Sequence, residues 1–197
     1  MAEILSKEEI DALLSYEPLH EAHKGRHKSI QIVFSNFCKC FERSLSSQLR
    51  TNVKLKIGSI NKLSFSEFLL KLSFPTSIGI FSINSSESYS IIELNPSFIY
   101  PVIDRFLGGS GQTSIPQREM TDIEMVIVDK VMKNALDDLA FAWQELDKIK
   151  FFLKEKLCNS QFMKYISLDE PVLVIVLDVN MGYISGSMKF CFKESIL

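Results

Sequence analysis

The three histidines of this sequence could together bind a metal ion. His20, His23 and His27 fall within eight residues, a spacing that would bring all three imidazoles to one face of a helix. Pro18 and Gly25 argue against a stable helix there, because proline removes a backbone donor and glycine costs conformational entropy. We therefore favour a solvated basic leash over a metal site. The rest of the chain has no histidine, and hence no imidazole to activate a serine or cysteine nucleophile.

The four cysteines also fail to suggest a metal site. Cys38 and Cys40 are separated by one residue, whereas Cys158 and Cys191 stand far apart. No pair has the spacing of a zinc site. We interpret the cysteines as small hydrophobic residues of a core.

A glycine-rich stretch at residues 108–111 has the composition of a phosphate-binding loop without its other features. It lacks the Lys-Ser/Thr pair, and it follows a predicted helix where such loops precede one. Gly108 suits the position just after a helix, but that role does not require Gly109 or Gly111. We predict no catalytic residue, cofactor or metal, and we interpret the acidic residues of the later long helix as its solvated face: Asp122, Glu124, Asp129, Asp137 and Asp138.

Composition narrows the class of protein. A length of 197 residues fits one domain with appendages, and a net charge of −2 lacks the electrostatic footprint of a nucleic-acid-binding protein. The longest wholly apolar run, Val172 to Leu177, is far shorter than the roughly 20 residues that span a bilayer. The N-terminus carries acids where a signal peptide carries bases. We expect a soluble cytoplasmic protein.

Apolar periodicity predicts alternating helices and strands. Two long amphipathic helices are expected at 29–49 and 121–143, the second with Ile123 and Val126 on its inner face. Asn95-Pro96 opens a shorter helix that Pro101 should kink or shorten and that Gly108 ends. The sequence predicts strands at 53–57, 78–83, 89–94, 172–179 and 188–192.

The order of these elements repeats along the chain. Each long helix is followed by a similar short motif (Ser66-Glu67-Phe68 and Ser160-Gln161-Phe162), then a proline, then a buried strand. Two such halves imply pseudo-twofold symmetry, with both long helices on one shared sheet. We predict a single α/β sandwich domain at 29–197 with a sheet of mixed strand direction.

The first sixteen residues form a separate unit. Ser6 and Glu9 have the spacing of a capping box, and Ile10, Leu13 and Leu14 share one helical face. A helix this short is unstable alone in water, so it docks either on its own domain or in a partner's groove. Residues 17–28 are interpreted as a linker.

Four segments together resemble the FliM family of flagellar motor switch proteins. The N-terminal Ile4–Leu14 resembles that family's peptide for the phosphorylated response regulator CheY, and 91–96 running into 104–111 resembles its central signature. Arg118–Glu124 is similar to the entry of its second long helix, and Asn159–Phe162 resembles the segment that follows that helix. The match covers nearly the whole chain in the right order.

The resemblance implies a non-enzymatic rotor component of the cytoplasmic switch ring at the inner face of the bacterial membrane, with a CheC-like fold. The regulator-binding residues implied are Ile4, Leu5, Ser6, Glu8, Glu9, Ile10, Asp11, Leu13 and Leu14. The residues implied to contact the ring protein FliG are Asp104, Arg105, Gly108, Gly109, Ser110 and Gly111. Glycines would allow the partner's backbone to approach closely, so a bulky side chain at Gly109 is expected to block the contact. Neighbouring copies of the chain are further implied partners.

One expected partner depends on a further domain, and two alternative functions stay open beside the switch-ring role. The family's C-terminal domain, which binds FliN, has no counterpart before residue 197, so FliN is expected as a partner only if a further domain exists. A protein that supports only flagellar assembly or export would lack regulator binding. A CheC-like phosphatase would need a Glu and an Asn three residues apart on a long helix, whereas Glu42 and Glu124 are followed at that spacing by Leu45 and Ile127.

Overall fold

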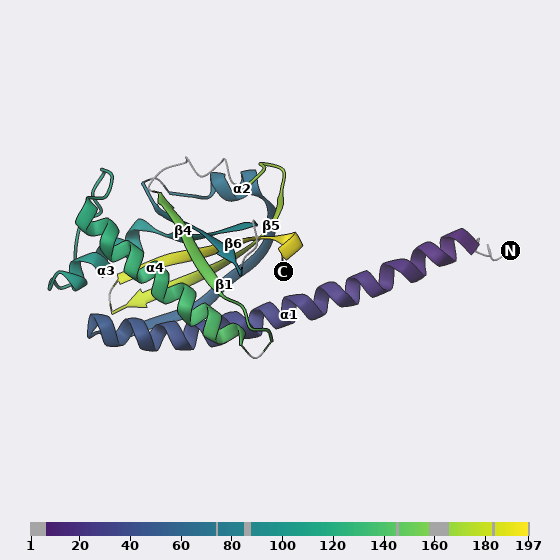
Figure 1. The fold of residues 1–197 in the computed structure, drawn as a ribbon, viewed down its shortest axis with the longest axis horizontal. Helices are drawn as coiled ribbons and strands as arrows, with labels where there is room; N and C mark the ends of the chain where they lie inside the picture. Colours follow the sequence, from purple (N-terminus) through teal and green to yellow (C-terminus); the bar gives the residue numbers. More distant parts are fainter. Residues whose placement is uncertain are drawn as a thin grey trace.

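The computed structural model describes residues 7–73, 75–84, 88–144, 146–157, 166–182 and 184–196, and for 7–27 it describes the backbone alone. The chain forms four helices, six strands and a terminal 3-10 turn within those ranges (Figure 1): α1 Lys7–Leu49, β1 Val53–Ser64, α2 Phe65–Leu70, β2 Ser77–Ile83, β3 Tyr89–Leu94, α3 Pro96–Phe106, α4 Asp122–Trp143, β4 Phe151–Leu157, β5 Pro171–Met181, β6 Ile184–Lys193 and Glu194–Ile196.

The six strands form one sheet in the order β1-β5-β6-β3-β2-β4. The first half of the chain runs α1-β1-β2-β3 and the second runs α4-β4-β5-β6. Exchanging the halves turns the strand order into its own reverse, so a pseudo-twofold axis passes between β3 and β6. The predicted α/β class and internal symmetry are confirmed.

The predicted mixture of strand directions is wrong. All five strand pairings are antiparallel. Short connections join β2 to β3 and β5 to β6, and such hairpins impose antiparallel pairing. The longer connection through α2 places β1 beside β5 of the other half instead of beside β2, so no parallel crossover forms.

Two apolar clusters cover the two faces of the sheet. The larger one joins α1, α3 and α4 to the sheet around Phe37, Phe81 and Phe190, and Phe190 meets Phe37 edge to face at 5.4 Å between ring centroids. The smaller one packs Phe65 and Phe68 of α2 on the opposite face. Figure 1 shows α1 and α4 on one side of the sheet and α2 on the other. The long helices therefore share a layer, as the sequence predicts.

The expectation that residues 17–28 lack helical structure is wrong. Helix α1 runs without a break from Lys7 to Leu49, through Pro18 and Gly25, and its first half projects from the body (Figure 1). Pro18 removes one backbone hydrogen bond, but most of its neighbours are good helix formers. The packed half of α1 supplies the nucleus from which a helix extends at little cost per residue. The roles assigned to 1–16, 17–28 and 29–197 remain predictions, and Ile4, Leu5 and Ser6 lie outside the described residues.

Of the six strands that the structure describes, β4 is the one that the sequence analysis missed. Its apolar residues stand at its start (Phe151, Phe152 and Leu153), and charged residues follow them. It pairs only with β2, at an edge of the sheet. An edge strand has one hydrogen-bonding side open and tolerates charged residues. Its sequence therefore lacks the apolar pattern by which a central strand is recognised. The Ser160-Gln161-Phe162 copy of the repeated motif lies outside the described residues.

Candidate functional site

Helix α3 carries two of the six predicted FliG-contacting residues, Asp104 and Arg105, and it begins as the sequence predicts. The Asn95 side chain accepts a hydrogen bond from the Ser97 amide at 3.0 Å, and Pro96 occupies the first helical position. The helix continues five residues past the buried Pro101, so the proline does not end it. Gly108, with φ +92°, follows the capping residue Leu107 and turns the chain away. The predicted role of Gly108 is confirmed.

Asp104 holds the loop that follows α3. Its carboxylate accepts a hydrogen bond from the Gly111 amide at 2.7 Å, and its carbonyl accepts one from the Gly109 amide at 2.8 Å. A Cβ atom on Gly109 would lie 2.2 Å from an Asp104 carboxylate oxygen. Gly111 is buried with φ +84°. The turn at Gly108 does not explain why residues 109 and 111 are glycines, but these contacts within the loop do. A substitution at Gly109 would therefore disturb the loop itself.

A hollow of about 260 Å³ opens beside this loop. Arg105, Ser110 and Gln112 line it together with residues from the α1–β1 turn and the β5–β6 turn: Thr51, Met181, Gly182 and Ile184. The Arg105 guanidinium lies 3.5 Å from the Thr51 hydroxyl. Within the described residues no carboxylate forms an ion pair with Arg105. The site thus offers an uncompensated cation beside apolar walls.

Sequence reasoning missed the far wall of this hollow. Met181 and Ile184 come from a hairpin about 75 residues away, which the sheet brings next to the end of α3. No pattern in the sequence predicts that this hairpin lies close to the end of α3. Leu107, whose side chain is 64% exposed, adds an apolar residue at the end of α3. The structure thus brings Asp104, Arg105 and the glycine loop together and adds an apolar wall to them.

Helix α4 begins at the predicted residue, but its buried face is not the predicted one. Thr121 and Glu124 form a capping box, and Arg118 pairs with both Glu124 carboxylate oxygens at 2.8 and 2.9 Å. Hydrogen bonds from Arg118 and Thr121 lower the pKa of Glu124 to about 2. Ile123 and Val126, predicted on the inner face, are instead 67% and 69% exposed. The buried face follows Val128, Val131, Met132, Ala135, Leu136, Leu139, Ala142 and Trp143.

The acidic residues of α4 are only partly a solvated face. Asp122 and Asp137 are exposed as predicted. Asp129 pairs with Lys133 and Lys156, both at 2.8 Å. Asp138 accepts a hydrogen bond from Ser44 of α1, and burial raises its pKa. Part of the charge on α4 therefore ties the helix to its neighbours.

Two of the cysteines behave as predicted. Cys38 and Cys191 are buried, and burial raises the pKa of the Cys38 thiol to about 12. Cys40 is only partly buried and lines a second hollow, between α1 and α4. Cys158 lies outside the described residues. Within the described parts of the chain, no cluster of side chains is suited to a metal ion and no helix is long and apolar enough to cross a membrane.

The chain resembles flagellar motor switch proteins in both sequence and structure. Curated FliM proteins of Bacillus subtilis and Thermotoga maritima are 29% and 30% identical to it over 99% and 88% of this chain. This chain spans 66% and 52% of those two relatives' lengths, and 63% of the Treponema pallidum relative. The structure matches a chain of the FliG–FliM complex from H. pylori with a TM-score of 0.83, at 26% identity, over 86% of this chain and 93% of that one. The H. pylori FliM middle domain matches with a TM-score of 0.76, at 25% identity, over 84% and 90%.

The family model for the flagellar motor switch protein FliM matches residues 23–197, which include α3, the glycine loop, all of α4 and α1 from residue 23 onward. The chain belongs to the flagellar motor switch protein FliM family.

Proposed function

We propose that this protein is a non-enzymatic component of the bacterial flagellar switch ring that binds a FliG-like protein at the end of α3. The observation that carries the proposal is the hollow beside Arg105, which lies between apolar side chains and the loop that Asp104 holds. The Arg105 side chain is a cation without an ion-pair partner among the described residues. A rigid loop loses little entropy on binding. The H. pylori relative's crystallisation with FliG supports the choice of partner.

Substitution of Ser110 by tryptophan tests the FliG-binding surface. Ser110 is exposed and lines the hollow, so a large side chain there would fill the hollow without the collision expected at Gly109. We expect Ser110→Trp to weaken binding to the organism's FliG homologue at least tenfold, which is about 1.4 kcal/mol. Isothermal titration of the full chain would measure this loss.

Ser167→Trp is the matched control, because Ser167 is also exposed but precedes β5, whose far end forms the hollow. The thermal midpoint of both variants should stay near that of the wild type. Equal loss of binding in the two variants would place the interface elsewhere. A folded wild-type chain that does not bind FliG would remove the proposed rotor role.

The N-terminal segment is proposed to capture the phosphorylated CheY-type regulator. Its sequence places Ile10, Leu13 and Leu14 on one helical face with Glu8, Glu9 and Asp11 nearby, which suits an apolar groove with a basic rim. The backbone of 7–28 is helical, about 33 Å long at the rise of an α-helix. The peptide would therefore be carried on a helical arm, which replaces the flexible leash expected from the sequence.

Leu13→Ala is expected to weaken regulator binding about tenfold and leave FliG binding unchanged, because leucine truncation at an apolar contact removes buried area. Fluorescence anisotropy with the phosphorylated regulator would measure it, with Ser15→Ala as the control outside the apolar set. Unchanged affinity would contradict the peptide assignment. A chain that binds FliG but no regulator would instead support an assembly or export scaffold.

A further inference from the structure

The three histidines of the chain lie on the first half of α1, which projects from the body as a helical arm (Figure 1). Pro18 and Gly25 argued against a metal site there because they disfavour a helix, but α1 runs through both residues without a break. The absence of a metal-binding cluster among the described side chains does not cover this segment, for which the backbone alone is described. The helical backbone therefore meets the condition that a shared metal site requires.

The helix brings positions 20, 23 and 27 to one face of the arm. Three or four residues complete roughly one turn of an α-helix, so these positions fall within about 60° of arc around its axis. His23 and His27 are four residues apart, the spacing by which two histidines on one helix bind zinc. His20 stands one turn before His23, so His23 belongs to two neighbouring pairs. Three imidazole ligands leave the fourth tetrahedral position of zinc to water.

The charges around the histidines nearly balance. Lys24, Arg26 and Lys28 repel a metal cation. Glu17 and Glu21, on the same stretch of the arm, attract it. Neutral imidazole binds zinc, copper and nickel without help from a charged ligand, so the small basic excess weakens the site without abolishing it.

We propose that His20, His23 and His27 together bind one divalent transition-metal ion such as Zn²⁺ across adjacent turns of α1. The ion ties these turns together and offsets the helix-destabilising effect of Pro18 and Gly25. A metal site that exists only in the helical state stabilises that state when it is filled. The inference goes beyond the proposed function, since the ion would stiffen the arm whatever partner the N-terminal segment binds.

Zinc titration of the full chain, purified without a polyhistidine tag and treated with EDTA, tests the site. We expect calorimetry to show about one Zn²⁺ ion per chain. His23→Gln should weaken binding at least tenfold, because it breaks both histidine pairs and even a lost outer-shell partner commonly costs tenfold. The matched control combines Ala22→His with His23→Gln, which keeps three histidines but moves one to another face of the helix. This control should bind as weakly as His23→Gln.

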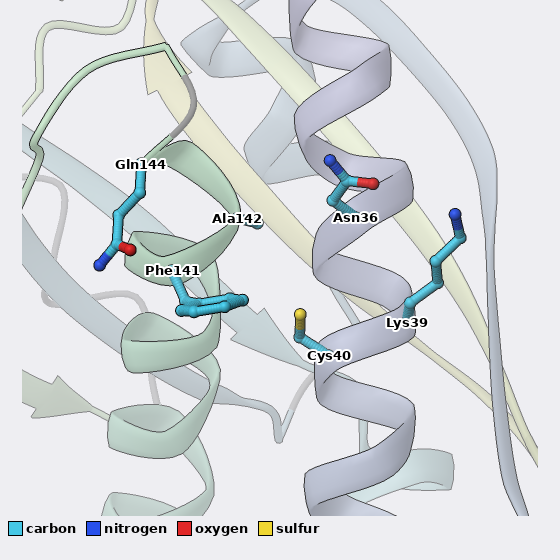
Figure 2. Close-up of a pocket in the computed structure, with 6 residues that line it drawn as sticks. All are labelled: Asn36, Lys39, Cys40, Phe141, Ala142 and Gln144. Carbon is cyan, nitrogen blue, oxygen red and sulfur yellow. The ribbon is translucent and has the colours of Figure 1, made fainter.

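Cysteine thiols are the competing zinc ligands. Cys40 is only partly buried and lines the hollow between α1 and α4, beside Phe141 (Figure 2). Burial raises the pKa of its thiol, which disfavours the thiolate that zinc requires. Cys40→Ser should therefore leave the zinc affinity unchanged, whereas a loss as large as that of His23→Gln would assign the ion to the thiol instead.

Trypsin protection tests whether the ion bridges helical turns. Trypsin cleaves after lysine and arginine, and positions 24 and 26 lie within the segment that the ion would hold. Cleavage requires local unfolding. Zinc at ten times its Kd should therefore slow cleavage about tenfold in the wild type. It should not do so in His23→Gln, which controls for any effect of zinc on trypsin itself.

Three results would overturn the proposal. The first is a folded wild-type chain that binds no zinc. The second is equal binding by the wild type and by the variant with the relocated histidine, which would mean that the shared helical face is irrelevant. The third is zinc binding without protection from trypsin, which would mean that the ion does not tie the turns of α1 together.

Discussion

Replacement of Lys189 by alanine is expected to destabilise the fold by about 3–5 kcal/mol, the range for removing one partner of a buried ion pair. Lys189 on β6 lies 3.1 Å from the Glu93 carboxylate on β3, across the pseudo-twofold axis. The Glu93 side chain is fully buried and also accepts a hydrogen bond from Thr76 at 2.8 Å. Without the ammonium group, the carboxylate would be buried with only a hydroxyl as partner. Urea unfolding of the variant would measure the loss.

The loss of stability in the Lys189→Ala variant is expected to grow as pH rises. Burial raises the pKa of Glu93 above 4.5, and Lys189 opposes that rise. The folded state of the Lys189→Ala variant would therefore hold a proton that the unfolded state releases above pH 4.5. Stability then falls as pH rises from about 4.5 through the raised folded pKa, so the deficit relative to wild type should be smaller at pH 5 than at pH 8.

Two further variants control this prediction. Lys154→Ala, at an exposed position of the edge strand β4, should cost less than about 0.5 kcal/mol. The double variant Glu93→Leu with Lys189→Met should recover most of the stability, because apolar pairs commonly replace buried ion pairs without loss. A Lys189→Ala variant as stable as Lys154→Ala would mean that the pair contributes nothing.

Gly186→Ala is the second substitution with a large expected effect, about 3 kcal/mol, at the upper end for overpacking. A Cβ atom at Gly186 on β6 would lie 2.6 Å from the backbone nitrogen of Phe98 and 2.7 Å from its Cα. The first turn of α3 cannot easily retreat, because the Asn95 amide donates to the Ser187 carbonyl at 3.1 Å. The extra methyl group must therefore displace α3, and with it the loop that Asp104 holds.

Thermal unfolding followed by circular dichroism measures this effect. Gly58→Ala is the control, since the atoms nearest to its Cβ would be those of the Asp178 carboxylate, the closest at 3.0 Å. That side chain is 42% exposed and can turn away, so the control should lose less than about 1 kcal/mol. A similar loss in both variants would contradict the prediction, because the close approach of α3 at Gly186 would then cause no specific loss, and alanine by itself suits a strand better than glycine does.

Local chemistry made much of the fold predictable. Asn95, Thr121 and Gly108 mark helix ends through hydrogen bonds and backbone angles that reach only a few residues, and such rules work without knowledge of the rest of the chain. The buried strands at 78–83 and 172–179 were recognisable because both of their faces are covered. The repeated order of elements then predicted the symmetry.

Errors arose where an outcome depends on long-range packing. Ile123 and Val126 are apolar, but the rotation of α4 is set by Val131, Ala135 and Leu139, which place them outward. The Arg105 hollow could not be predicted, because its far wall comes from the β5–β6 turn. At 17–28 we took Pro18 and Gly25 to argue against a helix, but α1 runs through both residues.

The exchange of edge strands between the two halves governs how the chain can fold during synthesis. Strand β1 pairs along its whole length with β5, from Val53 with Met181 to Ser64 with Pro171. The first half therefore leaves the ribosome without the strand that satisfies its edge, and this surface stays open until residue 181 has emerged. Contacts of such long sequence separation slow folding, and open strand edges promote aggregation. We expect neither half to be a stable fragment and the nascent chain to require protection until β5 has been made.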